Sequence, residues 1–155
     1  TGLFSKAMTS PCGKIRIPLN ESQDDKSQIE EFLREYKGEG IQHIALGSDD
    51  IYSAVDIIGA RGIPFQNTPE TYYEMLPERI QGHEEAIPEL KKRGILMDGA
   101  PTEGQGLLLQ IFTQNCIGPI FFEIIQRKGN PGFGEGNFQA LFESIERDQM
   151  RRGVL

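Results

Sequence analysis

The stretch IFFEIIQR at residues 120–127 is almost wholly apolar but carries one carboxylate, Glu123, near its centre. Burying an ionised carboxylate costs several kcal/mol or more unless a partner, commonly a metal or another cation, compensates its charge. Two other short apolar runs are interrupted in the same way, one by Gln42 and His43 and one by Gln110. Three strands that each carry polar groups into a core predict that these side chains line a single site.

The residues around these runs predict an α+β domain. Short strands alternate with amphipathic helices up to residue 94, and three strands with short connections containing Gly or Pro follow. Such connections favour an antiparallel meander, so we expect helices on one side of a curved, mainly antiparallel sheet. The expected strands are 41–46, 64–66, 95–98, 107–113 and 120–127. The first expected helix runs from a cap at Asp49 or Asp50 to Gly62, and the other two span 68–76 and 84–93.

Both ends of the chain add elements to this domain. Turn residues and amphipathic spacing predict a hairpin, a loop and a helix at the start, and a glycine-rich loop and a long helix at the end. The expected elements are strands at 3–8 and 14–19 around a turn at 10–13, a polar loop at 20–26, a helix at 28–36 closed by Gly38, a glycine loop at 129–136 and a helix at 138–152.

The composition and net charge of the chain indicate which classes of partner it is not expected to bind. The chain has 155 residues, a size typical of one domain, and a formal net charge of −7. Nucleic acid and anionic membranes attract basic surfaces, so we expect neither as a partner. Cys12 and Cys116 are not in a CxxC spacing, and the sequence shows no membrane-span run and no signal peptide. These features predict reduced thiols in a cytoplasmic protein.

His43 and Glu123 admit two interpretations each. His43 alone would be a core histidine with satisfied hydrogen bonds, and Glu123 alone would pair with an arginine. Imidazole and carboxylate on adjacent strands are also two members of the two-His-one-carboxylate set that binds Fe(II) in non-haem oxygenases. The second histidine of that set is missing, because His83, the only other one, lies in the polar segment 81–85 and reads as a surface residue.

The glycine loop between a strand and a helix invites comparison with a dinucleotide-binding turn. Its spacing is G-x-G-x-G instead of G-x-G-x-x-G, and Glu135 would repel a pyrophosphate. The loop carries Phe133 and is followed by Phe138, so we expect it to place aromatic rings over a pocket for an aromatic ligand.

Eight segments of the chain, in order, resemble the 4-hydroxyphenylpyruvate dioxygenase family. The resemblance covers essentially the whole chain, and its last two blocks are long and specific. Bacterial members of this family have also been labelled haemolysins or legiolysins. The segments are IRIPLNE, SQIEEFL, GIQHIAL, TYYEML, RGILMDG, LLLQIFT, FFEIIQRKG and GFGEGNFQALFESIERDQMRRGVL.

The resemblance implies a fold of the vicinal-oxygen-chelate type, built from βαβββ modules around Fe(II). It implies that residues 1–155 are a catalytic, C-terminal dioxygenase domain that lacks its first strand. Within it, 1–38 would be the tail of a first module, 39–128 the second module, and 129–155 the glycine loop and a helix that gates the pocket. The start Thr-Gly-Leu-Phe, without Met and inside an expected strand, fits a fragment.

By the same resemblance, His43 and Glu123 match two of the three iron ligands of the family. The remaining ligand, a histidine, would belong to a strand upstream of residue 1. The chain alone would then bind iron poorly and be inactive, whereas the parent protein would be a homo-oligomeric enzyme.

The resemblance also implies a nearly complete set of residues around the substrate, a small aromatic 2-oxo acid, and O₂. Gln42, Gln110 and Asn137 would act in catalysis. The substrate-binding positions would be Ser5, Pro18, Asn20, Gln28, Phe112, Phe121, Phe133 and Phe138.

The implied reaction converts 4-hydroxyphenylpyruvate and O₂ to homogentisate and CO₂ in tyrosine and phenylalanine catabolism. A first alternative is a hydroxymandelate synthase, which would oxygenate the benzylic carbon of the same substrate. A second is a non-enzymatic fragment with a haemolysin label, although no segment is apolar or amphipathic enough to insert into a membrane.

Overall fold

The computed structural model describes residues 3–23, 25 and 27–153, which divide into two compact units. The first unit contains the described residues up to Gln42 together with Ile117–Ile120, and the second contains the described residues of His43–Cys116 and Phe121–Leu155. Among the described residues, no helix has both the length and the apolar character needed to cross a membrane.

The first unit is a β-hairpin followed by a helix. Strands β1 (Leu3–Thr9) and β2 (Arg16–Ser22) pair antiparallel, with Ser5 opposite Asn20. Helix α1 (Gln28–Tyr36) begins after Ser27, whose hydroxyl accepts a hydrogen bond from the Glu30 amide at 3.2 Å. The hairpin and the helix are confirmed. The predicted loop at 20–26 was wrong at its start, because pairing continues through Ser22, and positions 24 and 26 lie outside the described residues.

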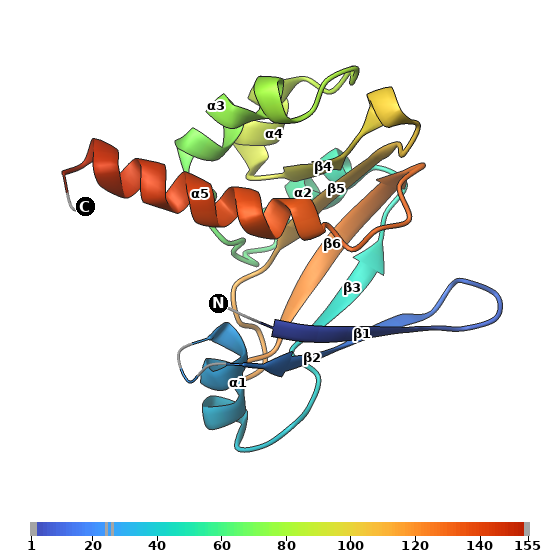
Figure 1. The fold of residues 1–155 in the computed structure, drawn as a ribbon, viewed down its shortest axis with the longest axis vertical. Coiled ribbons are helices and arrows are strands. Elements are labelled where there is room, and N and C mark those ends of the chain that lie inside the picture. The colour runs from blue at the N-terminus through green and yellow to red at the C-terminus, as the bar shows by residue number, and fades with distance from the viewer. Residues whose placement is uncertain (1–2, 24, 26, 154–155) are drawn as a thin grey trace. The chain divides into compact units, whose positions relative to one another are not determined.

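The second unit is built on a four-stranded sheet in the order β3-β6-β5-β4 (Figure 1). The predicted meander is confirmed, because β4 pairs antiparallel with β5, and β5 pairs antiparallel with β6. The first strand of the unit, β3, pairs parallel with the last, β6. The α+β class and the mainly antiparallel sheet are therefore confirmed. The strand bounds are β3 (His43–Gly47), β4 (Leu96–Gly99), β5 (Leu107–Phe112) and β6 (Phe121–Lys128).

Four α-helices and one 3-10 turn complete the part of this unit that the structure describes. Helices α3 and α5 lie against each other, and α5 also contacts β4, whereas α2 packs on β6 (Figure 1). The helices are α2 (Ile51–Ala60), α3 (Glu70–Arg79), α4 (Ile87–Arg93) and α5 (Glu135–Arg151), and the turn η1 is Pro101–Glu103.

Several predicted boundaries in this unit were wrong. The strand expected at 64–66 is a single bridge between Phe65 and Thr113, since Pro64 lacks the amide that a ladder needs. Helix α4 begins at Ile87 and not at residue 84, with a proline in its first turn, where a missing amide does no harm. Helix α5 begins at Glu135, three residues earlier than expected, because Gly134 at φ 80° caps it.

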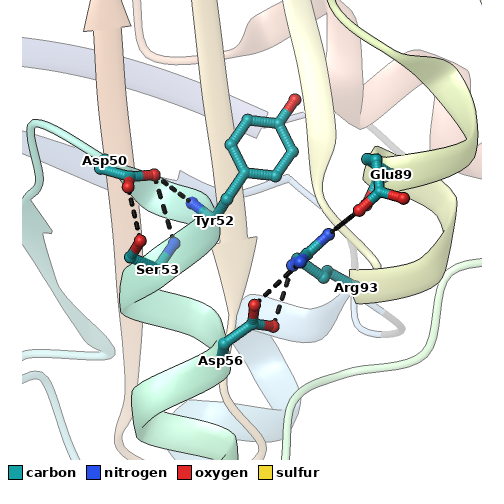
Figure 2. Close-up of polar contacts among 6 residues, drawn as sticks. All are labelled: Asp50, Tyr52, Ser53, Asp56, Glu89 and Arg93. Carbon is teal, nitrogen blue, oxygen red and sulfur yellow. Dashed lines mark hydrogen bonds and ion pairs between the residues drawn. The ribbon is translucent and has the colours of Figure 1, made fainter.

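Helix α2 is held at its start and along its side by charged residues (Figure 2). The carboxylate of Asp50 accepts hydrogen bonds from the amides of Tyr52 and Ser53 at 3.1 and 3.2 Å. Of the two residues predicted as possible caps, Asp49 and Asp50, the cap is therefore Asp50. The guanidinium of Arg93, at the end of α4, donates to both carboxylate oxygens of Asp56 at 2.9 and 2.8 Å. The contact between Arg93 and Asp56 holds α2 against α4.

The hydrophobic core lies between one sheet face and helices α2, α3 and α4. The register places Met97, Leu109, Ile111 and Ile124 on this face. They belong to one cluster with buried residues of the three helices, which are Ile51, Val55, Tyr72, Tyr73, Leu76 and Leu90.

The opposite sheet face carries the polar residues of the predicted site, because side chains alternate along each strand. Helix α5 starts over this face, where Asn137 contacts Gln110. The expectation of helices on one side of the sheet was made for residues 40–127, and it is confirmed for α2, α3 and α4, which share the core face.

Tyr72 closes the outer edge of the sheet at β4. Its side chain is fully buried, and its hydroxyl accepts a hydrogen bond from the Met97 amide at 2.9 Å and lies 3.0 Å from the Met97 carbonyl. An outer strand otherwise leaves such groups unpaired. The phenol thus substitutes for a neighbouring strand at this position.

We expect Tyr72→Phe to lower the free energy of unfolding by about 1–3 kcal/mol, because the buried Met97 amide loses its acceptor. Tyr73→Phe is the matched control, since the Tyr73 hydroxyl is buried and has no hydrogen-bond partner among the described residues. Its removal should leave the free energy of unfolding unchanged or raise it, because a buried hydroxyl without a partner is itself costly. Urea unfolding of both variants measures the difference, and equal losses would contradict the role given to the Tyr72 hydroxyl.

Candidate metal and substrate site

His43 and Glu123 lie together on the sheet face that α5 partly covers. In the parallel pair of β3 and β6, Ala45 is opposite Glu123 and His43 is opposite Phe121. The two-residue alternation therefore turns His43 and Glu123 to the same side. His43 Nε2 is 3.7 Å from Glu123 Oε2. Residues 80 positions apart in the sequence are brought into contact by strand pairing alone.

Gln110 and Asn137 hold the other oxygen of this carboxylate. Gln110, on β5, donates from Nε2 to Glu123 Oε1 at 3.1 Å. Asn137, in the first turns of α5, donates from Nδ2 to Gln110 Oε1 at 2.9 Å. Glu123, Gln110 and Asn137 are only 6%, 3% and 2% exposed. Three buried polar side chains are thus joined in a row, which leaves Glu123 Oε2 directed toward His43.

Burial has the largest effect on the pKa values of Glu123 and His43. It raises the pKa of Glu123 to about 7, although the charge of Arg127 and the Gln110 hydrogen bond act in the opposite direction. Burial also lowers the pKa of His43, which favours the neutral imidazole. A positive charge placed between the two groups would relieve the burial cost of the carboxylate, and a neutral imidazole offers it a nitrogen lone pair.

The alternative in which Glu123 pairs with an arginine is met in part by Arg127. The guanidinium of Arg127 donates to the backbone carbonyls of Asn130 and Gly132 in the glycine loop. Its charge lowers the pKa of Glu123, but by less than burial raises it. The donor set of His43 and Glu123 therefore still fits a divalent cation.

The described residues contain no group of three or more His, Cys, Asp or Glu side chains arranged to hold a metal ion. His43 and Glu123 are the two members that the structure brings together, and a third protein ligand stays a prediction. His83, read as a surface residue, is partly exposed, and its Nδ1 accepts a hydrogen bond from the Glu85 amide at 3.1 Å.

Aromatic rings surround the imidazole of His43. The ring of Phe121 is stacked on it, with centroids 5.0 Å apart, and the ring of Phe112 meets it edge-on at 6.2 Å. These two members of the predicted aromatic lining therefore lie at the candidate metal position. Phe133, before α5, and Phe138, on α5, are 36% and 56% exposed.

The remaining predicted substrate residues belong to the first unit. Ser5 and Asn20 are opposite each other in the hairpin, and Pro18, two residues from Asn20, is on the same face of the ribbon. Gln28 is the first residue of α1, and Gln42 directly precedes β3. Their convergence with His43 and Glu123 around one substrate stays a prediction.

Gly134 allows the glycine loop to lie against Gln110. A Cβ atom at this position would be 1.8 Å from Gln110 Oε1, and the backbone has φ 80°, a conformation that favours glycine. The first turn of α5 is held against β4, because the Gly136 amide donates to Asp98 Oδ2 at 2.9 Å. The loop therefore packs against the site instead of forming a phosphate cradle.

A hollow of about 600 Å³ beside the same loop is separate from the His43–Glu123 pair. Its lining includes the acidic residues Asp98 and Glu135 but neither His43 nor Glu123. An acidic lining disfavours a pyrophosphate, which agrees with the argument against a dinucleotide site.

Sequence reasoning missed Tyr72 and Arg79, which continue the hydrogen-bonded row beyond Asn137. The Tyr72 hydroxyl donates to Asn137 Oδ1 at 2.6 Å, and Arg79 Nη2 donates to the same oxygen at 3.1 Å. In the sequence, Tyr72 lies on an expected helix and Arg79 just beyond it, with no sign of contact with Asn137, which is 65 residues after Tyr72 and 58 after Arg79. No signal from local pattern could have found them.

Comparison with known proteins finds relatives that are similar to this chain over its whole length. The model of the Glyoxalase/Bleomycin resistance protein/Dioxygenase superfamily matches residues 1–76. Hemolysin VllY of Vibrio vulnificus is 68% identical over 155 residues, and a 4-hydroxyphenylpyruvate dioxygenase of Pseudomonas aeruginosa is 66% identical over the same length. Each match covers 100% of this chain and 43% of the relative.

A solved structure supports the same fold. A mutant of 4-hydroxymandelate synthase from Streptomyces coelicolor is 36% identical, with a TM-score of 0.79, over 95% of this chain and 42% of that chain.

The chain is thus similar to the glyoxalase and dioxygenase superfamily over residues 1–76, and a strand, helices and three strands form its second unit. Along its whole length the chain is similar to proteins named 4-hydroxyphenylpyruvate dioxygenase, and the resemblance stated from the sequence is confirmed. The chain spans less than half the length of the curated relatives that it matches.

We expect Gly134→Ala to disturb the site more than a glycine replacement elsewhere. The new methyl group would impose backbone strain of about 1–2 kcal/mol and would also displace the Gln110 side chain, at about 1–3 kcal/mol more. Gly104→Ala is the matched control, because Gly104 has φ 76° and no atom within 4 Å of an added Cβ. Urea unfolding compares the two; equal free-energy losses would show that contact with Gln110 is unimportant.

The raised pKa of Glu123 predicts a pH dependence for the metal-free protein. The folded state holds this proton up to about pH 7, whereas the unfolded state loses it near 4.5, so stability from this group is present at low pH and falls between these values. Between pH 5 and 8, the wild type should lose about 2–3 kcal/mol more than Glu123→Gln, which cannot ionise. Urea unfolding at both pH values measures this difference, and parallel pH profiles would refute the shift.

Proposed function

We propose that the protein containing this chain is an Fe(II)-dependent dioxygenase that converts 4-hydroxyphenylpyruvate and O₂ to homogentisate and CO₂. The observation that carries the proposal is the pair of half-buried His43 and buried Glu123, with 3.7 Å between Nε2 and Oε2. The whole-chain similarity to proteins named 4-hydroxyphenylpyruvate dioxygenase, at 66% and 64% identity, supports this choice of reaction.

His43 and Glu123 would hold the iron, and a third protein ligand would come from a histidine outside the 155 residues. Bound Fe(II) would supply open positions for the 2-oxo acid group and for O₂. The donor types fit, because imidazole nitrogen and carboxylate oxygen are the ligands of non-haem Fe(II) oxygenases.

The chain's own residues would fix the geometry around the iron. Gln110 donates a hydrogen bond to Glu123 Oε1 at 3.1 Å, which leaves Oε2 on the side of His43, where it would bind the metal. Such contacts from outside the coordination shell orient ligands and raise metal affinity. Asn137 in turn orients Gln110 at 2.9 Å, so the position of the carboxylate depends on the start of α5.

The aromatic residues would shape the substrate pocket and limit its water content. Phe112 and Phe121 meet the His43 ring and provide apolar surface for a phenol ring. Ser5, Asn20, Gln28 and Gln42 would add polar contacts to the substrate, and Pro18, Phe133 and Phe138 would add apolar ones. Helix α5 would act as the cover that excludes water from a reactive centre.

Hydroxymandelate synthesis is the second candidate reaction, because the related 4-hydroxymandelate synthase has the same fold at 36% identity. Oxygen would then enter the benzylic carbon instead of the ring. The higher identity to proteins named 4-hydroxyphenylpyruvate dioxygenase favours ring hydroxylation. A non-enzymatic protein, suggested by the name of the Hemolysin VllY relative, is the third possibility that the same test separates.

The intact protein containing this chain should bind one equivalent of Fe(II) and release homogentisate from 4-hydroxyphenylpyruvate. Glu123→Ala and His43→Ala should each remove a ligand and lower bound iron and product formation by at least about a hundredfold. His83→Ala is the control and should leave both near wild type. Iron analysis and chromatography of products measure the outcome.

The results separate the three functions. Hydroxymandelate as the only product would favour the second candidate. Wild-type iron content in Glu123→Ala would refute the ligand assignment. Absence of iron-dependent turnover in the intact, iron-loaded protein would refute an enzymatic role.

A further inference from the structure

A row of hydrogen bonds joins the positive charge of Arg79 to the negative charge of Glu123. Arg79 Nη2, at the end of α3, donates to Asn137 Oδ1 at 3.1 Å. Asn137 Nδ2 donates to Gln110 Oε1 at 2.9 Å, and Gln110 Nε2 donates to Glu123 Oε1 at 3.1 Å. Two neutral amides therefore connect a cation on a helix to a carboxylate at the centre of the sheet.

The direction of every bond in this row is set at the Arg79 end. A guanidinium can only donate, and the Tyr72 hydroxyl also donates to Asn137 Oδ1 while it accepts from the Met97 amide. These donors hold the oxygen of Asn137 toward Arg79, so its NH₂ group must face Gln110. The oxygen of Gln110 then faces Asn137, and its NH₂ group faces Glu123.

We propose that Arg79 is a positioning residue that acts through Asn137 and Gln110 to orient Glu123 for metal binding. This inference rests on the proposed function, because it takes Glu123 as a metal ligand. Without the fixed amide direction, Gln110 could present its oxygen to Glu123, and two acceptors facing each other would repel. Outer contacts of this kind change metal affinity although they never touch the metal.

Arg79 also has contacts that a purely structural role would explain. Its guanidinium donates to the Gly136 carbonyl at 3.0 Å and to the Met97 carbonyl at 2.5 Å, which ties α3 to α5 and to β4. Removing Arg79 could therefore loosen the fold without any effect of amide direction. A decisive variant must reverse the direction and keep the contact with Arg79.

Asn137→Asp meets this requirement. A carboxylate still accepts from Arg79, now as an ion pair, but it offers Gln110 an oxygen instead of an NH₂ group. Gln110 must turn its amide to donate to this oxygen, which places its own oxygen against Glu123 Oε1. We expect the affinity of the intact protein for Co²⁺ alone to fall by about tenfold or more, with the folded state retained.

A second set of variants tests the Arg79 end. Arg79→Gln should weaken Co²⁺ binding by about tenfold, and Arg79→Lys, which keeps the charge, should restore part of the affinity. The matched control is Arg151→Gln. Arg151 also joins α5 to α3, with Nη2 2.6 Å from Glu74 Oε2, but it does not touch the row. Its loss should change Co²⁺ affinity by less than about twofold.

Calorimetric titration with Co²⁺, the Co²⁺ absorption spectrum and thermal unfolding are measured on every variant. Weaker binding and an altered spectrum in Asn137→Asp and Arg79→Gln, but not in Arg151→Gln, would support the inference. Wild-type binding in Asn137→Asp, or equal effects of Arg79→Gln and Arg151→Gln, would overturn it and leave the proposed metal site standing. If the wild type itself fails to bind Co²⁺, the proposed function falls and the inference falls with it.

Discussion

The burial of one carboxylate is the constraint on which the second unit depends. Glu123 is 6% exposed at the centre of an apolar strand, where its charge needs compensation. Gln110 and Asn137 supply hydrogen bonds to this region, and both are themselves buried. Gly134 must lack a side chain so that the loop can lie against Gln110. A strand, a neighbouring strand, a loop and a helix start are therefore adapted to a single acidic group.

The sheet order makes this arrangement possible. Because β3 pairs parallel with β6, the first strand of the unit lies beside the last, and His43 is brought to Glu123. The core on the other face is filled by α2, α3 and α4, which leaves the polar face to the candidate site and to the start of α5. Tyr72 links both functions, since its ring belongs to the core and its hydroxyl reaches Met97 and Asn137.

Elements with a clear local signal were predicted well. Amphipathic spacing gave the bounds of α1, and alternating apolar runs located β5 and β6 to within one residue. The prediction was wrong where backbone geometry decides, as at Pro64, at the start of α4 and at Gly134. Such boundaries depend on single residues whose effect changes with the surrounding contacts.

The sequence by itself determined which strands carry polar groups into the core, and it singled out His43, Gln110 and Glu123 as members of one site. It could do so because a buried charge within an apolar run is costly wherever the strand lies. Only the tertiary structure decided that Arg79 and Tyr72 join this group through Asn137. Their side chains come from a helix distant in the sequence, and the contacts exist only because α3, α5 and the edge of the sheet pack together.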